Sequence, residues 1–330
     1  MKAYDLLIVG AGPTGISVAI AAQKAGFSHL IIERGPIANA LYHFPLNMTF
    51  FSTSEKLEVG GVPFISHTPR PTRSEALEYY RRLVKSYSLN IEAYSEVKDL
   101  KKTVAGGFEV STSRSTYAAT SVVLATGFYG LPRTLNVPGE DLPKVRHYFD
   151  DPHLYIDQKV LVVGAANSAC DVALETWMKG ADVTMAVRGS EIYEKVKYWI
   201  KPNIENRIAE GSIKAHFNTT VAEIREGEVD LNTPDGIVTI ANDFVLAMTG
   251  YKPDYTFLES CGVQMSDDKH RTPRFDAETL ESGDVPGLYL AGVINAGMAT
   301  STLFIENTRH HGDMIVKGIE ARVAEVKVDA

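Results

Sequence analysis

Cysteine is scarce in this chain of 330 residues. The two cysteines are Cys170 and Cys261, and no C-x-x-C pair occurs. Two thiols this far apart in sequence do not form a dithiol motif of the kind that catalyses thiol–disulfide exchange. We therefore expect both to be structural, Cys170 as a small core residue of one helix and Cys261 near the end of another.

Positive charge and long apolar runs are also lacking. The formal net charge is −8 and the pI is near 5.6, which argues against nucleic acids and anionic membranes as main partners. No apolar stretch is long enough to cross a bilayer, and an apolar strand begins soon after Met1, so we expect no signal peptide and a cytoplasmic location. No spacing of histidines and carboxylates indicates a metal site.

The chain does contain two glycine-rich turns, each between an apolar run and a stretch that predicts a helix. The first turn follows the apolar residues 6–9 and contains Gly10, Gly12, Pro13, Thr14 and Gly15. In a dinucleotide-binding turn, Gly10 allows the sharp bend, Gly12 the close approach of a pyrophosphate, and Gly15 the close packing of helix on strand. The free amides at the helix N-terminus then face the anion.

An acidic residue follows the first turn at the expected distance. The apolar residues 30–32 predict a second strand, and it ends in Glu33, 18 residues after Gly15. A carboxylate at this place binds ribose hydroxyls in dinucleotide-binding folds. We expect Glu33 and the adjacent Arg34 to bind FAD together with the first turn, the alternative being an ordinary surface carboxylate.

The second turn departs from the glycine pattern. It follows the apolar residues 160–163 and contains Gly164, Ala166, Asn167, Ser168 and Ala169. Alanine is small enough to keep the backbone close to a ligand. The next predicted strand, 183–187, ends in Arg188 instead of an acid, and an arginine suits a 2′-phosphate, so we predict NADPH over NADH. Lys195 and Lys197 are close enough in sequence to help, and the alternative for Arg188 is a solvated charge.

Two dinucleotide-binding units in one chain suggest that electrons pass between two dinucleotides, most simply from a nicotinamide to a flavin. Two further apolar strands end in Thr126-Gly127 and in Gly250, and a linker rich in proline and glycine follows the first. We therefore expect an α/β fold with two Rossmann-like domains. Residues 1–128 and 251–330 would form a discontinuous FAD domain, and residues 129–250 an inserted NADPH domain.

The C-terminal part is expected to complete the flavin site. Residues 288–292 predict a last buried strand that ends at Gly292, and a polar turn over residues 295–302 then opens a helix through 304–307. Thr302 or Ser301 would be its N-cap, and Thr302 and Ile305 would lie near the flavin. The positive N-terminal end of this helix would stabilise an anionic reduced ring.

Several short segments extend these motifs along the chain. They are residues 49–52, 141–145, 147–149, 167–169, 199–200, 202–203, 250–251, 253–255, 291–294 and 304–307. With these segments the chain resembles, over nearly its whole length, the bacillithiol disulfide reductases, which are NADPH-dependent flavoproteins of the bacilliredoxin system. The resemblance implies a fold like low-molecular-weight thioredoxin reductase without its dithiol, FAD and NADPH as cofactors, Phe51 and Ser52 at the FAD site, a small disulfide as acceptor, and a homo-oligomer.

One position departs from the family pattern. The family has a cysteine, regarded as redox-active, where this chain has Thr14, and a hydroxyl cannot replace a thiolate as a redox nucleophile. No catalytic side chain is therefore assigned. Three acceptor hypotheses stay open: direct reduction of a disulfide, reduction of a ferredoxin or flavodoxin, and a FAD- and NADPH-binding redox sensor. The F-x-G-x-x-x-H signature of flavin monooxygenases is absent after Phe128.

Overall fold

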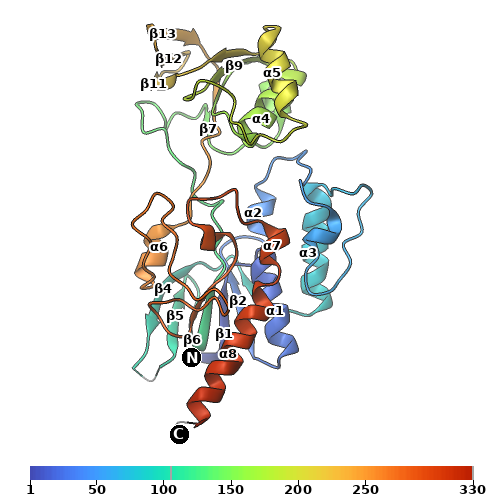
Figure 1. Cartoon of the computed structure of the whole chain (residues 1–330), viewed down its shortest axis with the longest axis vertical. Coiled ribbons are helices and arrows are strands. Elements are labelled where there is room, and N and C mark those ends of the chain that lie inside the picture. The colour runs from blue at the N-terminus through green and yellow to red at the C-terminus, as the bar shows by residue number, and fades with distance from the viewer. Residues whose placement is uncertain (105, 329–330) are drawn as a thin grey trace. The chain divides into compact units, whose positions relative to one another are not determined.

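A computed structural model describes residues 1–104 and 106–328 of the chain. Its contacts divide the chain into two compact units (Figure 1). The first, here called the outer unit, contains Met1–His43, Asn47–Leu131 and the chain from Tyr251 onward. The second, the central unit, contains Pro132–Gly250 and the short segment Phe44–Leu46. One unit thus holds both the start and the end of the chain.

The outer unit is built on a seven-stranded sheet. The strand order is β3-β2-β1-β6-β5-β4, and β15 pairs with the last three residues of β6, whose first residues pair with β5. Strands β1, β2, β3, β6 and β15 are parallel, whereas β4, β5 and β6 pair antiparallel. The strands are β1 (Lys2–Val9), β2 (His29–Glu33), β3 (Ile91–Ala93), β4 (Val97–Lys102), β5 (Phe108–Thr112), β6 (Thr116–Leu124) and β15 (Leu288–Leu290).

Strand β1 shows why the parallel part of this sheet forms. Its second half is a continuous apolar run, which suits a strand that is covered on both faces. Leu7 and Val9 pack into the core cluster that also contains Leu258 of a helix, while Leu6 and Ile8 are fully buried on the opposite face. Because side chains alternate between faces, a shift of one residue would exchange the two sets.

Helices and helical turns flank this sheet. They are α1 (Pro13–Lys24), α2 (Asn39–Tyr42), α3 (Arg73–Ser86), α6 (Tyr255–Ser260), α7 (Ile305–Thr308) and α8 (His311–Val328), with 3₁₀ turns η1 (Ser54–Leu57) and η3 (Gly292–Ala296). Helix α1 starts with Pro13, whose missing amide hydrogen costs nothing at this position. Helix α8 lies along α1 (Figure 1), and a Cβ on Gly312 would lie 2.6 Å from the Ser17 carbonyl oxygen.

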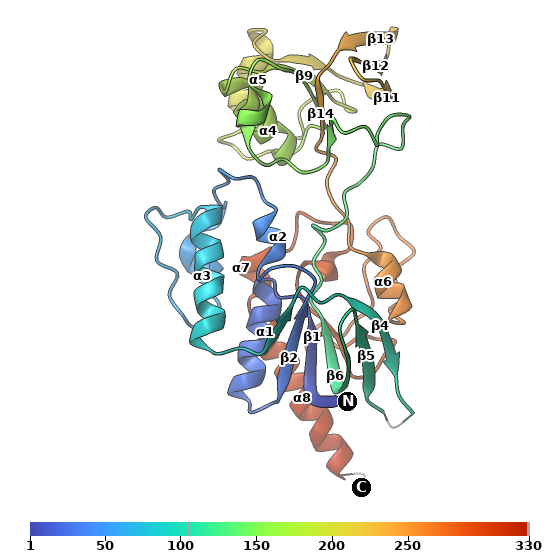
Figure 2. The same cartoon turned by 180° about the vertical axis from the view of Figure 1, so that it is seen from behind.

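The central unit contains a second parallel sheet and a small antiparallel one (Figure 2). The parallel order is β10-β9-β8-β14-β7, and the antiparallel order is β11-β12-β13. The elements are β7 (Val145–Arg146), η2 (Pro152–Tyr155), β8 (Lys159–Val163), α4 (Asn167–Met178), β9 (Asp182–Ala186), α5 (Lys201–Ala209), β10 (Lys214–His216), β11 (Thr220–Ile224), β12 (Glu228–Thr233), β13 (Gly236–Ala241) and β14 (Phe244–Ala247). An α/β fold with two Rossmann-like sheets, as predicted, is confirmed.

The two faces of β8 separate the two cores of the central unit. Val160 and Val162 pack against apolar residues of α4 and α5. Leu161 and Val163 pack against apolar residues of the antiparallel sheet, among them Val229. One apolar strand therefore holds a helical layer on one face and a small sheet on the other.

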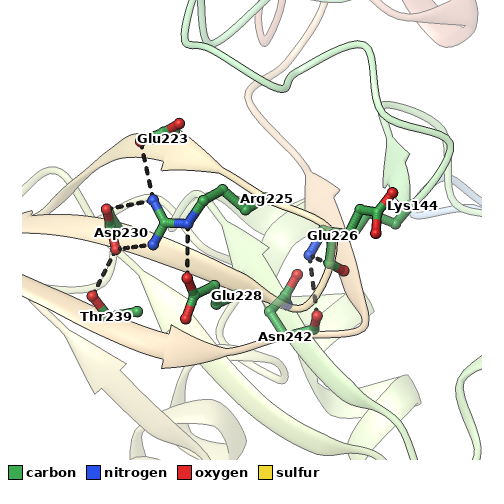
Figure 3. A network of polar contacts seen from close by, with 8 residues as sticks. All are labelled: Lys144, Glu223, Arg225, Glu226, Glu228, Asp230, Thr239 and Asn242. Atoms are coloured by element: carbon green, nitrogen blue, oxygen red, sulfur yellow. Dashed lines mark hydrogen bonds and ion pairs between the residues drawn. The ribbon is translucent and has the colours of Figure 1, made fainter.

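An arginine with four hydrogen bonds to carboxylates joins strands of the antiparallel sheet (Figure 3). Both terminal nitrogens of Arg225 donate to Asp230 at 2.7 Å, and other donors reach Glu228 at 2.8 Å and Glu223 at 3.0 Å. Thr239 donates to Asp230 from the neighbouring strand. The hydrogen bonds from Arg225 and then Thr239 lower the pKa of Asp230 to about 2.

Replacing Arg225 with Gln should raise the pKa of Asp230 from about 2 toward its ordinary value of 3.8. A lowered carboxyl pKa stabilises the folded state above the ordinary value, and that stabilisation is lost as the pH falls toward 2. The free energy of unfolding should therefore fall less in the variant than in the wild-type protein as the pH is lowered from 3.8 to about 2. Carbon-13 NMR titration of the side chain measures the pKa, with Lys98→Gln as the control. An Asp230 that still titrates near 2 in Arg225→Gln would contradict the assignment.

Candidate functional site

The first glycine turn joins β1 to α1, and two of its glycines are required by the protein's own backbone. Gly10 has φ +111°, and a Cβ there would lie 2.5 Å from the Ala125 carbonyl oxygen. A Cβ on Gly15 would lie only 1.9 Å from the Gly10 carbonyl oxygen. These contacts hold the start of α1 directly against the end of β1.

Gly12 differs from its two neighbours in the turn. It is the N-cap of α1, with ordinary extended dihedral angles, and apart from its two chain neighbours no atom of the described residues lies within 4 Å of the position of a Cβ. No side chain caps the first amides of this 12-residue helix. Open space beside free amides at a helix N-terminus is the geometry that a bound phosphate requires.

Glu33 ends β2 next to this turn and is 7% exposed. Its two carboxylate oxygens each accept one backbone hydrogen bond at 2.8 Å, from Ala11 and from Gly35. These bonds fix the orientation of the carboxylate, and each oxygen keeps a lone pair for a further hydroxyl donor. Arg34 is exposed and extends to Gly130, where a Cβ would lie 2.0 Å from one of its terminal nitrogens.

The carboxyl ends of β6 and β15 lie at the same edge of the sheet as the first turn. Ala125 donates to the Val9 carbonyl and Ala291 to the Leu124 carbonyl, so the strand ends are in register. Thr126 and Gly127 follow β6. The Thr126 hydroxyl oxygen is buried and has no hydrogen-bond partner among the described residues. Buried polar groups of this kind are normally satisfied, so this hydroxyl fits a polar group of a bound ligand.

Thr14 and Gly292 meet behind the turn. A Cβ on Gly292, whose φ is +86°, would lie 3.1 Å from the Thr14 hydroxyl oxygen. The Thr14 hydroxyl lies 3.0 Å from that of Thr308, which donates its own proton to the Phe304 carbonyl. Thr14 is therefore the donor to Thr308, and its hydroxyl proton points to the C-terminal segment.

The segment after Gly292 differs from the helix expected there. It forms the 3₁₀ turn η3 and then α7, a single turn of four residues whose N-cap is Phe304, so Ser301 or Thr302 as N-cap is wrong. The Thr302 hydroxyl donates to the Ala299 carbonyl instead, and Asn307 accepts from the Phe304 amide. The expected stabilisation of a reduced flavin ring by the N-terminal end of this segment stays a prediction. Ile305 is the first residue of α7.

Phe51 and Ser52 lie in the loop between α2 and η1. Backbone hydrogen bonds fix this loop on both sides, from Phe50 to the Pro71 carbonyl and from Ser54 to the Pro69 carbonyl. Phe51 is partly exposed. The loop therefore has a defined path beside α3, and its place in a cofactor site stays a prediction.

The second turn joins β8 to α4, and its first glycine is again required by a close contact with the backbone. Gly164 has φ +132°, and a Cβ there would lie 2.7 Å from the Met248 carbonyl oxygen and 3.1 Å from the Ala169 Cβ. Ala166 is the N-cap of α4, and no side chain caps the helix. Ala166 and Ser168 are exposed. The amides at this helix N-terminus thus suit a phosphate, as in the first turn.

One side chain near the second turn holds the loop before α5 in place, and another provides positive charge. Asn167 accepts a hydrogen bond from the Lys197 amide at 2.9 Å, which fastens the loop before α5 to the start of α4. Arg188 follows β9 and is exposed, with no hydrogen bond or ion pair to the described residues. Gly250 has φ +91° and follows β14, and its carbonyl accepts from the Arg133 amide. Arg188 thus keeps all its donors for an anion.

Both cysteines are buried, as expected for structural residues. Burial raises the pKa of the Cys170 thiol in α4 to about 12 and that of Cys261, the C-cap of α6, to about 11. Thiols in this state are inert as nucleophiles near neutral pH. Among the described residues, no group of three or more His, Cys, Asp or Glu side chains is arranged for a metal ion, and no helix could span a membrane.

Sequence reasoning missed two contacts of this site. Thr308 accepts from Thr14 across 294 positions, and His311 accepts a hydrogen bond from the Gly292 amide at 3.0 Å. Both contacts join distant segments, and neither residue stands in a motif with its partner. The signal available in the sequence was the pairing of histidines at 310–311 after a predicted helix.

Comparisons with known proteins agree with this geometry. The sequence pattern of the family described as pyridine nucleotide-disulphide oxidoreductase matches residues 7–292. The chain is 44% identical over 317 residues to bacilliredoxin reductase Bdr of Bacillus subtilis (strain 168), covering 96% of this chain and 97% of that protein.

Solved structures are similar over almost the whole chain. Bacillithiol disulfide reductase Bdr (YpdA) from Staphylococcus aureus superposes with a TM-score of 0.94 at 41% identity, covering 98% of this chain and 99% of that one. Thioredoxin reductase of T. acidophilum gives a TM-score of 0.76 at 22% identity, with 98% and 100% covered. The second likeness establishes a shared fold.

Gly12→Ala and Gly15→Ala should differ in their effect on the stability of the cofactor-free protein. Gly12→Ala meets no protein atom, so thermal unfolding without cofactor should be unchanged, while FAD binding should weaken by about 1–3 kcal/mol through overpacking against the pyrophosphate. Gly15→Ala should destabilise the cofactor-free protein, because its Cβ meets the Gly10 carbonyl. Calorimetry and FAD titration separate the effects, with Gly227→Ala as control. Unchanged FAD affinity in Gly12→Ala would contradict a pyrophosphate at this turn.

Proposed function

This chain belongs to the pyridine nucleotide-disulphide oxidoreductase family, within the bacilliredoxin reductase (Bdr) group, and from that premise we propose that it uses NADPH to reduce bacillithiol disulfide. It is a flavin-dependent oxidoreductase with FAD and NADPH as cofactors. In the proposed reaction, NADPH gives up two electrons and one proton, and a second proton comes from solvent. The disulfide bond breaks, and two thiols and NADP⁺ are the products.

The two glycine turns carry this proposal. Each lies at the carboxyl edge of its own parallel sheet, where ligands bind in folds of this class. The turn beside Glu33 is built for a ribose with free hydroxyls, and the turn beside Arg188 for a ribose that carries a phosphate. When bound, FAD supplies a two-electron relay between the nicotinamide and the acceptor.

In the outer unit, the protein's contribution to FAD binding is orientation. Gly12 and the free amides of α1 receive the pyrophosphate, the fixed carboxylate of Glu33 accepts from ribose hydroxyls, and Thr126 offers its unpaired hydroxyl. Gly127, Gly292, Phe51, Ser52, Thr302 and Ile305 complete the proposed set with Gly10, Pro13, Thr14, Gly15 and Arg34. Close backbone contacts at Gly10 and Gly15 define the path of the turn, and a preformed turn limits the entropy lost on binding.

In the central unit, positive charge selects the nicotinamide cofactor. Arg188 is exposed, and none of its five N–H donors has a hydrogen bond or ion pair with the described residues. We propose that it binds the 2′-phosphate of NADPH, with Lys197 nearby, while Gly164, Ala166, Asn167, Ser168, Ala169 and Gly250 approach the rest of the nucleotide. A carboxylate at position 188 would repel that phosphate and would favour NADH.

The protein has no thiol for the step to the disulfide. Thr14 stands at the position of the family cysteine, and its hydroxyl donates to Thr308. Cys170 and Cys261 are buried thiols with raised pKa values. The proposal is therefore that the acceptor disulfide is reduced at the cofactor without a covalent protein–substrate disulfide. A cytoplasmic location, which suits two unpaired cysteines, and a homo-oligomer are parts of the same proposal.

Arg188→Ala should raise the Michaelis constant for NADPH and leave that for NADH nearly unchanged. Charge-assisted hydrogen bonds contribute about 1.5–3 kcal/mol, which corresponds to roughly 10- to 150-fold in affinity. Steady-state kinetics with both nucleotides measures the change. Lys179→Ala, which removes an exposed cation beyond the C-terminus of α4, is the control. Equal effects of Arg188→Ala on NADPH and NADH would rule out this arginine as the discriminator.

Thr14 variants test the step to the acceptor. Thr14→Ala should leave FAD reduction by NADPH largely intact, since one neutral hydrogen bond contributes about 0.5–1.5 kcal/mol. Thr14→Cys puts a thiol at the N-terminus of α1, where its pKa should fall, and should increase the rate of bacillithiol disulfide reduction. Thr14→Ser is the matched control.

The assay is NADPH oxidation with bacillithiol disulfide, other small disulfides, a ferredoxin or a flavodoxin as acceptor. The parent protein should prefer bacillithiol disulfide. A clear preference for ferredoxin or flavodoxin, with no response to the disulfide even in Thr14→Cys, would overturn the proposed substrate and favour a single-electron acceptor. No NADPH consumption with any acceptor would favour the sensor hypothesis.

A further inference from the structure

A buried histidine holds the segment that follows the last strand of the outer sheet. The Gly292 amide donates to Nδ1 of His311 at 3.0 Å, and both residues are buried, with His311 8% exposed. Gly292 is the first residue of η3 and has φ +86°, which turns its amide away from the usual direction of a strand. A buried amide without an acceptor is costly, so His311 stabilises this segment by accepting the hydrogen bond from Gly292.

The hydrogen bond determines the chemical state of His311. Nδ1 can accept only when it carries no proton, so the ring is neutral with its proton on Nε2. Burial, followed by the charge of His310, lowers the pKa of His311 to about 4. The charged or titratable neighbours in sequence are Arg309, His310 and Asp313. Thr14 of α1 lies against Gly292, and Ser17 of α1 binds the Arg309 carbonyl; both are uncharged, as are all residues of η3.

Three segments converge where His311 lies. Gly292 lies against Thr14 of the first turn, as a Cβ there would be 3.1 Å from the Thr14 hydroxyl. Ser17 of α1 donates its hydroxyl to the Arg309 carbonyl at 2.5 Å. The start of α8 is therefore fastened both to α1 and, through the His311 ring, to the end of β15.

We infer that His311 is a positioning residue for bound FAD, acting through the Gly292 amide. The inference rests on the proposed FAD site at the first turn. The His311 ring keeps Gly292 and the rest of η3 at a fixed distance from Thr14, so that η3 and the first turn keep one arrangement around the proposed site at the start of α1. Loss of the acceptor leaves the Gly292 amide unpaired, and η3 then shifts relative to the turn.

The experiment compares two substitutions with different acceptors. In His311→Asn, the side-chain oxygen takes the place of Nδ1 and can accept from Gly292, whereas His311→Ala has no acceptor. His153→Ala, which removes an exposed histidine in the central unit, is the control. The dissociation constant for FAD is measured by flavin fluorescence on stripped protein, and the visible circular dichroism of the bound flavin reports the asymmetry of its surroundings.

His311→Ala should weaken FAD binding on the order of tenfold, as expected for an unpaired buried donor, and should change the visible spectrum. His311→Asn should restore both the affinity and the spectrum. Far-UV circular dichroism checks that each variant is folded. Wild-type affinity and spectrum in His311→Ala would overturn the inference, and so would a folded His311→Asn that behaves like His311→Ala.

A measurement on the wild-type protein covers the case in which the variants do not fold. Long-range proton–nitrogen NMR at pH 7 should show the Nε2-protonated neutral tautomer of His311. The Nδ1-protonated tautomer or an imidazolium would overturn the inference. Failure of the wild-type protein to bind FAD would instead contradict the proposed function, and the tautomer result separates the two cases.

Discussion

The contact between Gly15 and the carbonyl oxygen of Gly10 is the constraint on which the outer unit depends. The distance leaves no room for a side-chain carbon, so α1 starts directly at the end of β1. The position of the N-terminus of α1 places its free amides beside Gly12 and the Ala11 amide against Glu33. It also brings the Thr14 hydroxyl to that of Thr308. Helix α8 then packs on α1 at Gly312, which joins the end of the chain to its beginning.

The central unit also joins a strand to a helix by a tight turn, but with different residues. Gly164 makes a similar close approach to the residues after a neighbouring strand, at the Met248 carbonyl oxygen, but alanines replace the later glycines. The larger difference is in charge. The first unit places a fixed carboxylate after its second strand, and the second unit places an exposed arginine there. In the proposed function, this contrast distinguishes a site for a ribose with free hydroxyls from a site for a phosphorylated ribose.

Much of the architecture was predictable because it depends on local patterns. Glycines and small residues at fixed positions after apolar runs predicted both turns and the strands before them. The absence of a cysteine pair predicted buried, structural thiols. The helix start at Thr302 was wrong because a hydroxyl that could cap a helix donates to Ala299 instead. The contacts of Thr308 and His311 were not predicted, because Thr308 meets Thr14 across 294 positions and His311 binds the Gly292 amide 19 positions away, outside any motif.

The central claim is that one chain binds FAD in its outer unit and takes electrons from NADPH through its central unit. The most direct measurement is anaerobic titration of the purified, FAD-loaded protein with NADPH, followed by visible absorption. The account predicts about one FAD per chain, full loss of the oxidised flavin spectrum with about one equivalent of NADPH, and much slower reduction by NADH at equal concentration. A protein that takes up no FAD, or whose bound flavin stays oxidised with NADPH, would contradict it.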